Sequence, residues 1–356
     1  MKKGILLLVA LAAATLQVKA QIGNNADTTL LAKPISDSVS VAGVKPSHIT
    51  TVAVNDTTAI SYIRPQGYHF ITNIPKDWLE FGQRTVSKKG LITVGALAAS
   101  TALLMTIDRP AMDAVQQFGR WAGVSGERKF ANTIKFKMGG TAVNFMDLPQ
   151  NLNSTLYFIG EGWPTIAFTA GVLVKGLITN DNRAIQTASQ IGEGYLAMGI
   201  TVQLIKRLTG RQSPFKTTKG SGNWQLAPAY SHYQGDVPNH DAFPSGHLAT
   251  AMASITIYAE NYPEIRWIRP VGYTVMGLVG LAMMNNGVHW MSDYPLAIAI
   301  GYTYGKIVTS RDKSIRVFSR RGNHNPEVGK LSFGPKVIGS PYYQDYTLGL
   351  SLSLTL

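Results

Sequence analysis

The most conspicuous absence in this sequence is cysteine, since none occurs among its 356 residues. The chain therefore forms no disulfide and offers no thiol nucleophile and no thiolate ligand for a metal. The absence does not decide the compartment, but it fits an exported chain that avoids thiol oxidation.

Acidic residues are also scarce. The chain has 20 Asp and Glu against 33 Lys and Arg, a formal net charge of +13. Such a balance favours anionic partners, either phosphate compounds or an anionic membrane surface. The basic residues are scattered and accompany no motif that binds RNA or DNA, so no nucleic-acid partner is predicted.

Long, strongly apolar runs are lacking as well. The chain begins Met1-Lys2-Lys3, continues with a short apolar run from Ile5 to Leu16, and has small residues at Val18 and Ala20. This pattern predicts a cleavable signal peptide over residues 1–20, and with it export to the periplasm or the cell-envelope membrane. The run is too short for a comfortable membrane span, although an uncleaved anchor is the alternative.

One later segment has the length of a membrane span. Gly90 to Ile107 is 18 residues without a charge, but its Gly, Ala, Ser and Thr content makes it only mildly apolar. Membrane association is therefore predicted. The choice between a soluble periplasmic protein and an embedded one stays open.

The rest of the chain is predicted to be mainly α-helical. We expect an exposed, poorly ordered lead-in over 21–75, a helical domain over 76–312 and a C-terminal β segment over 313–356. Residues 110–150 are expected to form short amphipathic helices and loops. Strict alternation of leucines from Tyr346 to Leu356 predicts a strand with one buried face. The main helices are expected at 155–178, 184–209, 246–260, 268–287 and 293–309.

Pro244-Ser245-Gly246-His247 precedes a run of small and apolar residues and predicts a loop that turns into a helix. A helix N-terminus offers unpaired N–H groups and a partial positive charge, which suit an oxyanion such as phosphate. Gly246 permits close approach, Ser245 adds a hydroxyl, and His247 can transfer a proton near neutral pH. The plainer interpretation is a Ser N-cap beside a solvated His.

Two further segments carry polar side chains of the same kind. Upstream, a helix ends in a basic turn from Lys206 through Arg211 to Pro214. Downstream, His289 and Asp293 are four residues apart, so on a helix they would share a face and the carboxylate could fix the ring tautomer. Such a pair can also be purely structural.

Together the three segments resemble the type 2 phosphatidic acid phosphatase (PAP2) family, which shares its fold with vanadium haloperoxidases. That family has Lys-x6-Arg-Pro, then Pro-Ser-Gly-His, then Ser-Arg-x5-His-x3-Asp. The resemblance covers about residues 90–310 and implies a PAP2-type helical bundle, here with a small C-terminal β extension. The matching positions are Lys206, Pro214, Pro244 to His247, His289 and Asp293.

Two departures from the family pattern concern phosphate binding. Ser213 stands at the first-motif arginine, and Ala282-Met283 stands at the third-motif Ser-Arg pair. Losing one preorganised donor to a developing oxyanion costs about 3–4 kcal/mol. Arg211 is the expected substitute, with Lys216, Lys219, Asn285 and Asn286 also near in sequence.

The resemblance implies phosphoryl transfer without a metal or cofactor. His289 would attack phosphorus to give a phosphohistidine, Asp293 would hold its other ring nitrogen, and His247 would act as acid and base. Lys206, Arg211, Ser245 and the Gly246 N–H would hold the phosphate oxygens.

The predicted function is an exported phosphatase for a phosphate monoester or pyrophosphate, of a lipid or a small phosphate ester. The alternative is a catalytically weakened relative that binds phosphorylated lipid or supports an envelope complex. Vanadate-dependent halide oxidation ranks last, because it would be expected to keep both arginines. The sequence leaves the substrate and the oligomeric state open.

Overall fold

The computed structural model describes residues 45–55, 58–138, 141–218, 220–311, 313–317, 332–338 and 347–353. The predicted signal peptide and residues 21–44 of the predicted lead-in lie outside these ranges. Two compact units divide the chain, a helical one that begins at Ile63 and ends at Asp312, and a smaller one built from the segments on either side.

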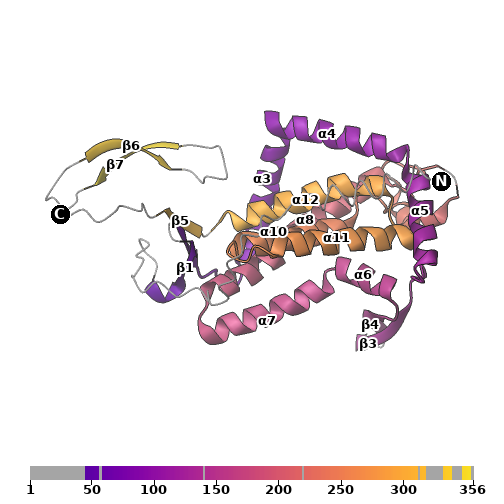
Figure 1. Ribbon diagram of the computed structural model, residues 1–356, viewed down its shortest axis with the longest axis horizontal. Helices are drawn as coiled ribbons and strands as arrows, with labels where there is room; N and C mark the ends of the chain where they lie inside the picture. The colour runs from indigo at the N-terminus through magenta and orange to yellow at the C-terminus, as the bar shows by residue number, and fades with distance from the viewer. Residues whose placement is uncertain are drawn as a thin grey trace. The chain divides into compact units, whose positions relative to one another are not determined.

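The helical unit confirms the mainly α prediction and most of the expected helix positions. Four helices, α8, α10, α11 and α12, pack together and enclose the main apolar core, which includes Val202, Leu248, Val279, Met283 and Ile300 (Figure 1). The helices are α2 (His69–Thr72), α3 (Ile74–Val86), α4 (Lys88–Met105), α5 (Asp108–Trp121), α6 (Leu152–Gly160), α7 (Trp163–Thr179), α8 (Asn182–Thr209), α9 (Tyr230–Gly235), α10 (Gly246–Asn261), α11 (Ile268–Asn285) and α12 (Tyr294–Thr309).

The helix boundaries follow from local sequence. Asp181 caps α8 by accepting hydrogen bonds from the N–H groups of Arg183 and Ala184, and Gly210 ends it with φ 53°. The helix expected over 155–178 is broken into α6 and α7, which meet at a 58° bend. Gly162 lies at that break with φ 90°, a conformation that favours glycine.

The expectation of helices and loops over 110–150 is right for α5 and wrong for residues 130–149. Strands β3 (Phe130–Met138) and β4 (Thr141–Pro149) form an antiparallel hairpin there. The sequence carries the signal in its Ile134, Phe136 and Met138 alternation and in the Gly139-Gly140 pair, which is typical of hairpin turns.

The smaller unit contains the predicted β segment and part of the predicted lead-in. Strands β1 (Ile49–Asn55), β2 (Thr58–Ile63) and β5 (Lys313–Val317) form one sheet in the order β1-β2-β5. Strand β2 runs antiparallel to β5 and buries Ala59, Ile60 and Tyr62, so the exposed lead-in is wrong for residues 49–63.

The last described strands are β6 (Ser332–Ile338) and β7 (Thr347–Ser353), which pair antiparallel. They confirm extended structure at the C-terminal end of the chain. Tyr346 and residues 354–356 of the alternating segment lie outside the described residues.

Helix α4 corresponds to the uncharged segment and lies at the edge of the helical unit between α3 and α5 (Figure 1). It presents large apolar side chains to the outside, including Leu91, Ile92 and Leu103. By length and composition it is the single described helix able to cross a membrane, and α6 with α7 would add a second span if the bent pair is counted as one.

Candidate active site

The imidazole rings of His247 and His289 lie beside each other, edge to face, in the helical unit. Their centroids are 5.8 Å apart and their planes meet at 71°. His247 lies in the first turn of α10, and His289 follows the turn at Asn286 and Gly287 that ends α11. His289 is 2% exposed, and His247 Nε2 is buried without a hydrogen-bond partner among the described residues. Two nitrogens that can transfer protons or attack phosphorus thus lie close together.

The N-terminus of α10 has the expected form. Ser245 is the N-cap, and its hydroxyl accepts a hydrogen bond from the Leu248 N–H at 3.4 Å. A side chain added at Gly246 would meet only Val202, at 3.9 Å, so the backbone there is open to close approach. The capping role and the anion-binding role of this segment are compatible, because the free N–H groups of the first turn remain.

The His289 ring is oriented by the main chain. Its Nδ1 lies 2.7 Å from the Ala242 carbonyl oxygen and 3.4 Å from Asp293 Oδ2. The carbonyl accepts the Nδ1 proton, which leaves a lone pair on Nε2. Asp293, which is predicted to hold this nitrogen, is the more distant of the two acceptors. His289 and Asp293 do not share a helix either, because Asp293 ends the 3-10 turn Met291–Asp293.

Arg211, which is predicted to hold phosphate, is engaged in this structure by acceptors of the protein itself. Its guanidinium is fully buried and donates to Asp108, Asp293, Ser292 and the Ser221 carbonyl. These contacts use all five N–H groups of the side chain. Asp108 is 103 residues away along the chain, so no local pattern could reveal this partner.

Lys206 lies in the last turn of α8, as predicted, and is 6% exposed. Its Nζ is 3.5 Å from Asp241 Oδ2. The pKa of His247 is well below its ordinary value, because burial disfavours the imidazolium and the charges of His289, Lys206 and Arg128 act in the same direction. The negative charge of a bound phosphate would act in the opposite direction and raise the pKa of His247.

Both positions that depart from the family pattern are buried. Ser213 is 1% exposed and Met283 is fully buried in the main core, where its sulfur accepts from the Ser245 hydroxyl at 3.8 Å. An arginine at 283 would have to enter packed hydrocarbon.

The other substitutes named from the sequence have partners of their own. Lys216 pairs with Asp236, and the Asn285 amide donates to Asn153. The Asn286 side chain accepts from the Val288 N–H. Lys219 lies outside the described residues.

Three residues at the site were not predicted from the sequence. The Tyr157 ring of α6 lies 4.3 Å from the His247 ring. A Cβ at Gly160 would come within 3.0 Å of His247, so glycine is required for α6 to pass this close. Arg128, in the loop before β3, has its guanidinium 5.3 Å from the centre of the Phe215 ring. The two glycines of Gly160-Glu161-Gly162 are a sequence signal for such close packing, whereas no sequence pattern marks Tyr157 or Arg128.

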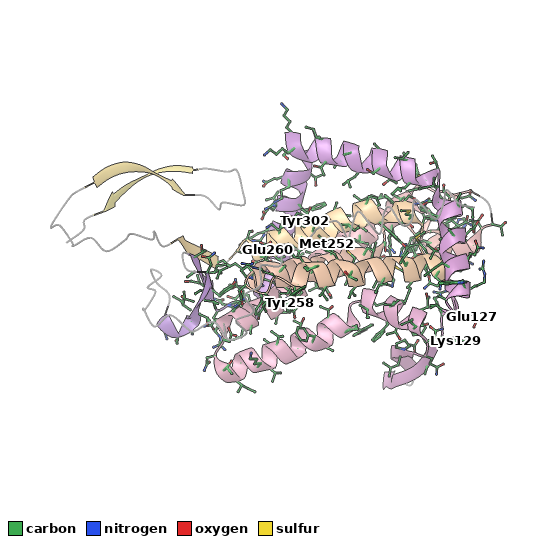
Figure 2. The ribbon with its side chains drawn as sticks, in the orientation of Figure 1. Glu127, Lys129, Met252, Tyr258, Glu260 and Tyr302 are labelled. Atoms are coloured by element: carbon green, nitrogen blue, oxygen red, sulfur yellow. The ribbon has the colours of Figure 1, made fainter. Side chains whose placement is uncertain are left out.

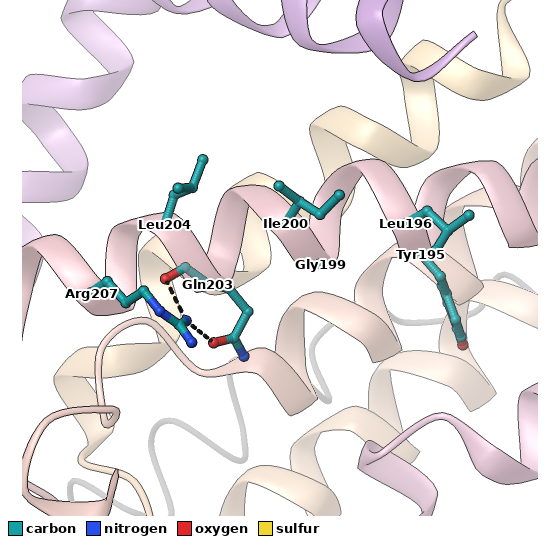
Figure 3. Close-up of a pocket in the computed structure, with 7 residues that line it drawn as sticks. All are labelled: Tyr195, Leu196, Gly199, Ile200, Gln203, Leu204 and Arg207. Atoms are coloured by element: carbon teal, nitrogen blue, oxygen red, sulfur yellow. Dashed lines mark hydrogen bonds between the residues drawn. The ribbon is translucent and has the colours of Figure 1, made fainter. Parts of the chain in front are cut away.

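A shallow apolar groove of about 380 Å³ lies on α8, apart from the two histidines (Figure 3). At one end Arg207 donates to the Gln203 side chain at 2.9 Å. Among the described residues, no group of three or more His, Asp or Glu side chains could hold a metal ion. The groove is lined by Tyr195, Leu196, Gly199, Ile200, Gln203, Leu204 and Arg207.

Comparisons with known proteins give one family and two individual matches. Residues 188–314 match the model of the PAP2 superfamily. The lipid A 1-phosphatase of Porphyromonas gingivalis is 35% identical over 68 residues, which are 19% of this chain and 15% of that protein. The crystal structure of a transmembrane PAP2-type phosphatidylglycerolphosphate phosphatase from Bacillus subtilis aligns over 69% of this chain and 96% of that one, with a TM-score of 0.31 and 14% identity.

Proposed function

The chain belongs to the PAP2 superfamily, and from this premise we propose that it is a phosphatase for a phosphate monoester or pyrophosphate of a lipid. The observation that carries the proposal is the pair of adjacent histidines at the α10 N-terminus. His289 there has its Nδ1 bound to a carbonyl, so its Nε2 keeps a lone pair.

In the proposed mechanism His289 Nε2 attacks phosphorus, and the bond to the leaving oxygen breaks. His247 gives that oxygen its proton, and the phosphoryl group remains on His289 as a phosphohistidine. Water then attacks phosphorus, His247 takes the water proton, and the bond to His289 breaks to release phosphate. Lys206, the Ser245 hydroxyl and the Gly246 N–H hold the non-bridging oxygens. Asp293 acts indirectly, through its contacts with His289 and Arg211.

A lipid substrate is favoured by the apolar surfaces of the helical unit. Helix α4 is long and apolar enough to lie in a membrane, and the groove on α8 would accept an acyl chain. A relative that matches part of this chain carries the name lipid A 1-phosphatase. Export to the periplasm or the envelope membrane, through the predicted signal peptide, belongs to the same proposal.

The test is phosphate release from lipid A 1-phosphate, phosphatidic acid, undecaprenyl pyrophosphate and a chromogenic monoester. Wild type is compared with His289→Ala and with a control, His232→Ala, whose side chain is exposed. We expect turnover by wild type and the control, and none by His289→Ala. Equal rates for all three proteins would overturn the proposal.

The second candidate is a phosphate-binding relative with little catalytic power, which the residues Ser213 and Met283 favour. It predicts that wild type binds vesicles containing phosphatidic acid as His289→Ala does, while neither protein releases phosphate. Sedimentation with vesicles of phosphatidylcholine, with and without phosphatidic acid, separates this candidate from the first.

A further inference from the structure

The site described above is short of guanidinium groups. Neither family position carries an arginine, and all N–H groups of Arg211 are engaged by protein acceptors. Lys206 is a point charge and cannot form the two parallel hydrogen bonds that an arginine makes to a phosphate. Another arginine near the histidines would restore this interaction.

Arg128 lies in that place. Its guanidinium is stacked over Phe215, two residues after Ser213, and interacts with the hydroxyl of Tyr157, whose ring lies against His247. Phe215 is in turn held beside the His289 segment, because its N–H donates to the Gly287 carbonyl at 2.9 Å. Arg128 is therefore near position 213, where the family has an arginine, and near His247.

The backbone around Arg128 is fixed by hydrogen bonds on both sides. The Asn151 amide donates to the Glu127 carbonyl at 2.9 Å, and the Lys129 N–H donates to the Ser154 hydroxyl at 2.8 Å. The loop also packs on the end of α11, since a Cβ at Gly126 would lie 2.5 Å from the Asn285 carbonyl oxygen. The arginine thus extends from a held segment rather than from a free loop.

No carboxylate among the described residues pairs with Arg128. The neighbouring Lys129, by contrast, pairs with Glu127 at 3.2 Å, and both side chains are exposed in the loop before β3 (Figure 2). An arginine that is solvent-accessible and free of a carboxylate partner is suited to an incoming anion.

We propose that Arg128 is a phosphate-binding residue that supplies, from the loop before β3, the guanidinium absent at positions 213 and 283. The inference rests on the proposed phosphatase function for its catalytic consequence. It assigns the substrate phosphate a position between the α10 N-terminus and Arg128, with Tyr157 and His247 beside it.

The test compares Arg128→Gln and Arg128→Lys with the adjacent control Lys129→Gln, using the full chain. We expect kcat/KM to fall about 100-fold in Arg128→Gln, since one preorganised donor is lost. The kcat/KM of Arg128→Lys should lie between those of Arg128→Gln and wild type, and that of Lys129→Gln should stay within about threefold of wild type. Circular dichroism and thermal unfolding verify that the variants are folded.

The pH profile gives a readout that a structural role would not move. The groups around His247 that bear on its pKa are the Tyr157 ring of α6, the His289 ring, Lys206 with its partner Asp241, and Arg128. Removing the Arg128 charge raises the pKa of His247, so the alkaline limb of kcat/KM, where the acid loses its proton, should move to higher pH in Arg128→Gln. The limb of Lys129→Gln should stay in place.

Orthophosphate binding, followed by ³¹P NMR, separates this inference from the proposed function. If wild type turns over and Arg128→Gln behaves like the control, the inference is overturned and the phosphatase stands. If wild type equals His289→Ala, the phosphatase fails, and an orthophosphate affinity reduced about tenfold in Arg128→Gln alone still supports the inference. Equal orthophosphate affinities, or no binding to wild type, would overturn it.

Discussion

Two arginines near opposite ends of α8, Arg211 and Arg311, each pair with several carboxylates, but the two clusters differ in their hydrogen bonds. Arg211, just after the end of the helix, is enclosed with Asp108 and Asp293. Arg311, which follows α12, pairs with Asp77, Glu80 and Glu193, the last from the first half of α8. Both clusters place more carboxylates than guanidinium groups inside the protein.

The clusters differ in how completely the carboxylates are satisfied. Around Arg211, Asp108 accepts from Ser292 through both N–H and hydroxyl, and Asp293 accepts from the Trp290 N–H. Burial raises the pKa of Asp108, but the Ser292 hydrogen bonds and the Arg211 charge oppose the rise. Protein donors therefore satisfy the carboxylate oxygens of this cluster.

Around Arg311 the described donors do not reach every carboxylate oxygen. Asp77 Oδ2 is buried without a partner among the described residues. Burial, with the Asp77 charge next, raises the pKa of Glu193 to about 8, and burial raises that of Asp77 as well. Burial thus favours the protonated form of these two carboxyl groups. The two clusters thus differ in their donors: each oxygen of Asp108 and Asp293 accepts a hydrogen bond, whereas Asp77 Oδ2 accepts none among the described residues.

The largest expected effect is that of breaking the paired cluster. Arg211→Met leaves Asp108 and Asp293 buried without their cation, and we expect a loss of about 3–5 kcal/mol in the free energy of unfolding. Chemical denaturation in one mild detergent measures it, with Arg207→Met, at a partly exposed position of α8, as control. A loss near zero would show that the carboxylates reach water or share a proton.

The next effect concerns the pH dependence of the second cluster. Below about pH 4.5 Glu193 is protonated in both the folded and the unfolded chain; between there and its folded pKa of about 8 only the folded chain keeps the proton. Stability from this group is thus full in acid and lost as the pH rises. Glu193→Gln, which resembles the protonated form, should reduce the decline between pH 5 and 8 by on the order of 2 kcal/mol. Glu127→Gln should keep the wild-type slope.

A smaller effect is expected from Ser292→Ala. The variant removes a hydroxyl that donates to Asp108 at 2.6 Å and accepts from Arg211 at 2.7 Å. We expect a loss of about 1–2 kcal/mol at neutral pH, because one buried donor and one acceptor are left short. Ser310→Ala, in which the lost hydroxyl only donates to the Ile307 carbonyl, is the comparison. Equal losses in the two variants would mean that the Asp108 network is not specially dependent on this hydroxyl.

The smallest effect is expected from Glu80→Gln. Its contact with Arg311 is 3.3 Å long and its side chain is 31% exposed, so water screens the pair. We expect a change of less than about 1 kcal/mol. A larger loss by thermal or chemical unfolding would place Glu80 on a level with Asp77 and remove the distinction between exposed and buried members of this cluster.

The sequence predicts the elements that depend on local pattern and misses what depends on distant contacts. The capping residues Asp181, Ser245 and Gly210, together with the apolar periodicity, are enough to define α8 and α10 from the residues alone. Strand β2 is not predicted from the sequence, because it pairs with β5, which lies about 250 residues later in the chain.

The same division applies to the site. The structure places the His247 and His289 rings beside each other, and Lys206 is near enough to His247 to affect its pKa. The partner of Arg211 could not be predicted, since it is set by where α5 packs. Arg128 gave no signal, because its significance lies in neighbours from α6 and from the turn at Phe215.

The acceptor that sets the tautomer of His289 is the carbonyl of residue 242, and every amino acid has one. Replacement of Ala242 by another small residue would change the side chain but leave that oxygen in place. The orientation of the His289 ring therefore does not depend on which side chain stands at position 242. A substitution at position 242 that preserves the backbone is expected to preserve the contact with His289 Nδ1 as well.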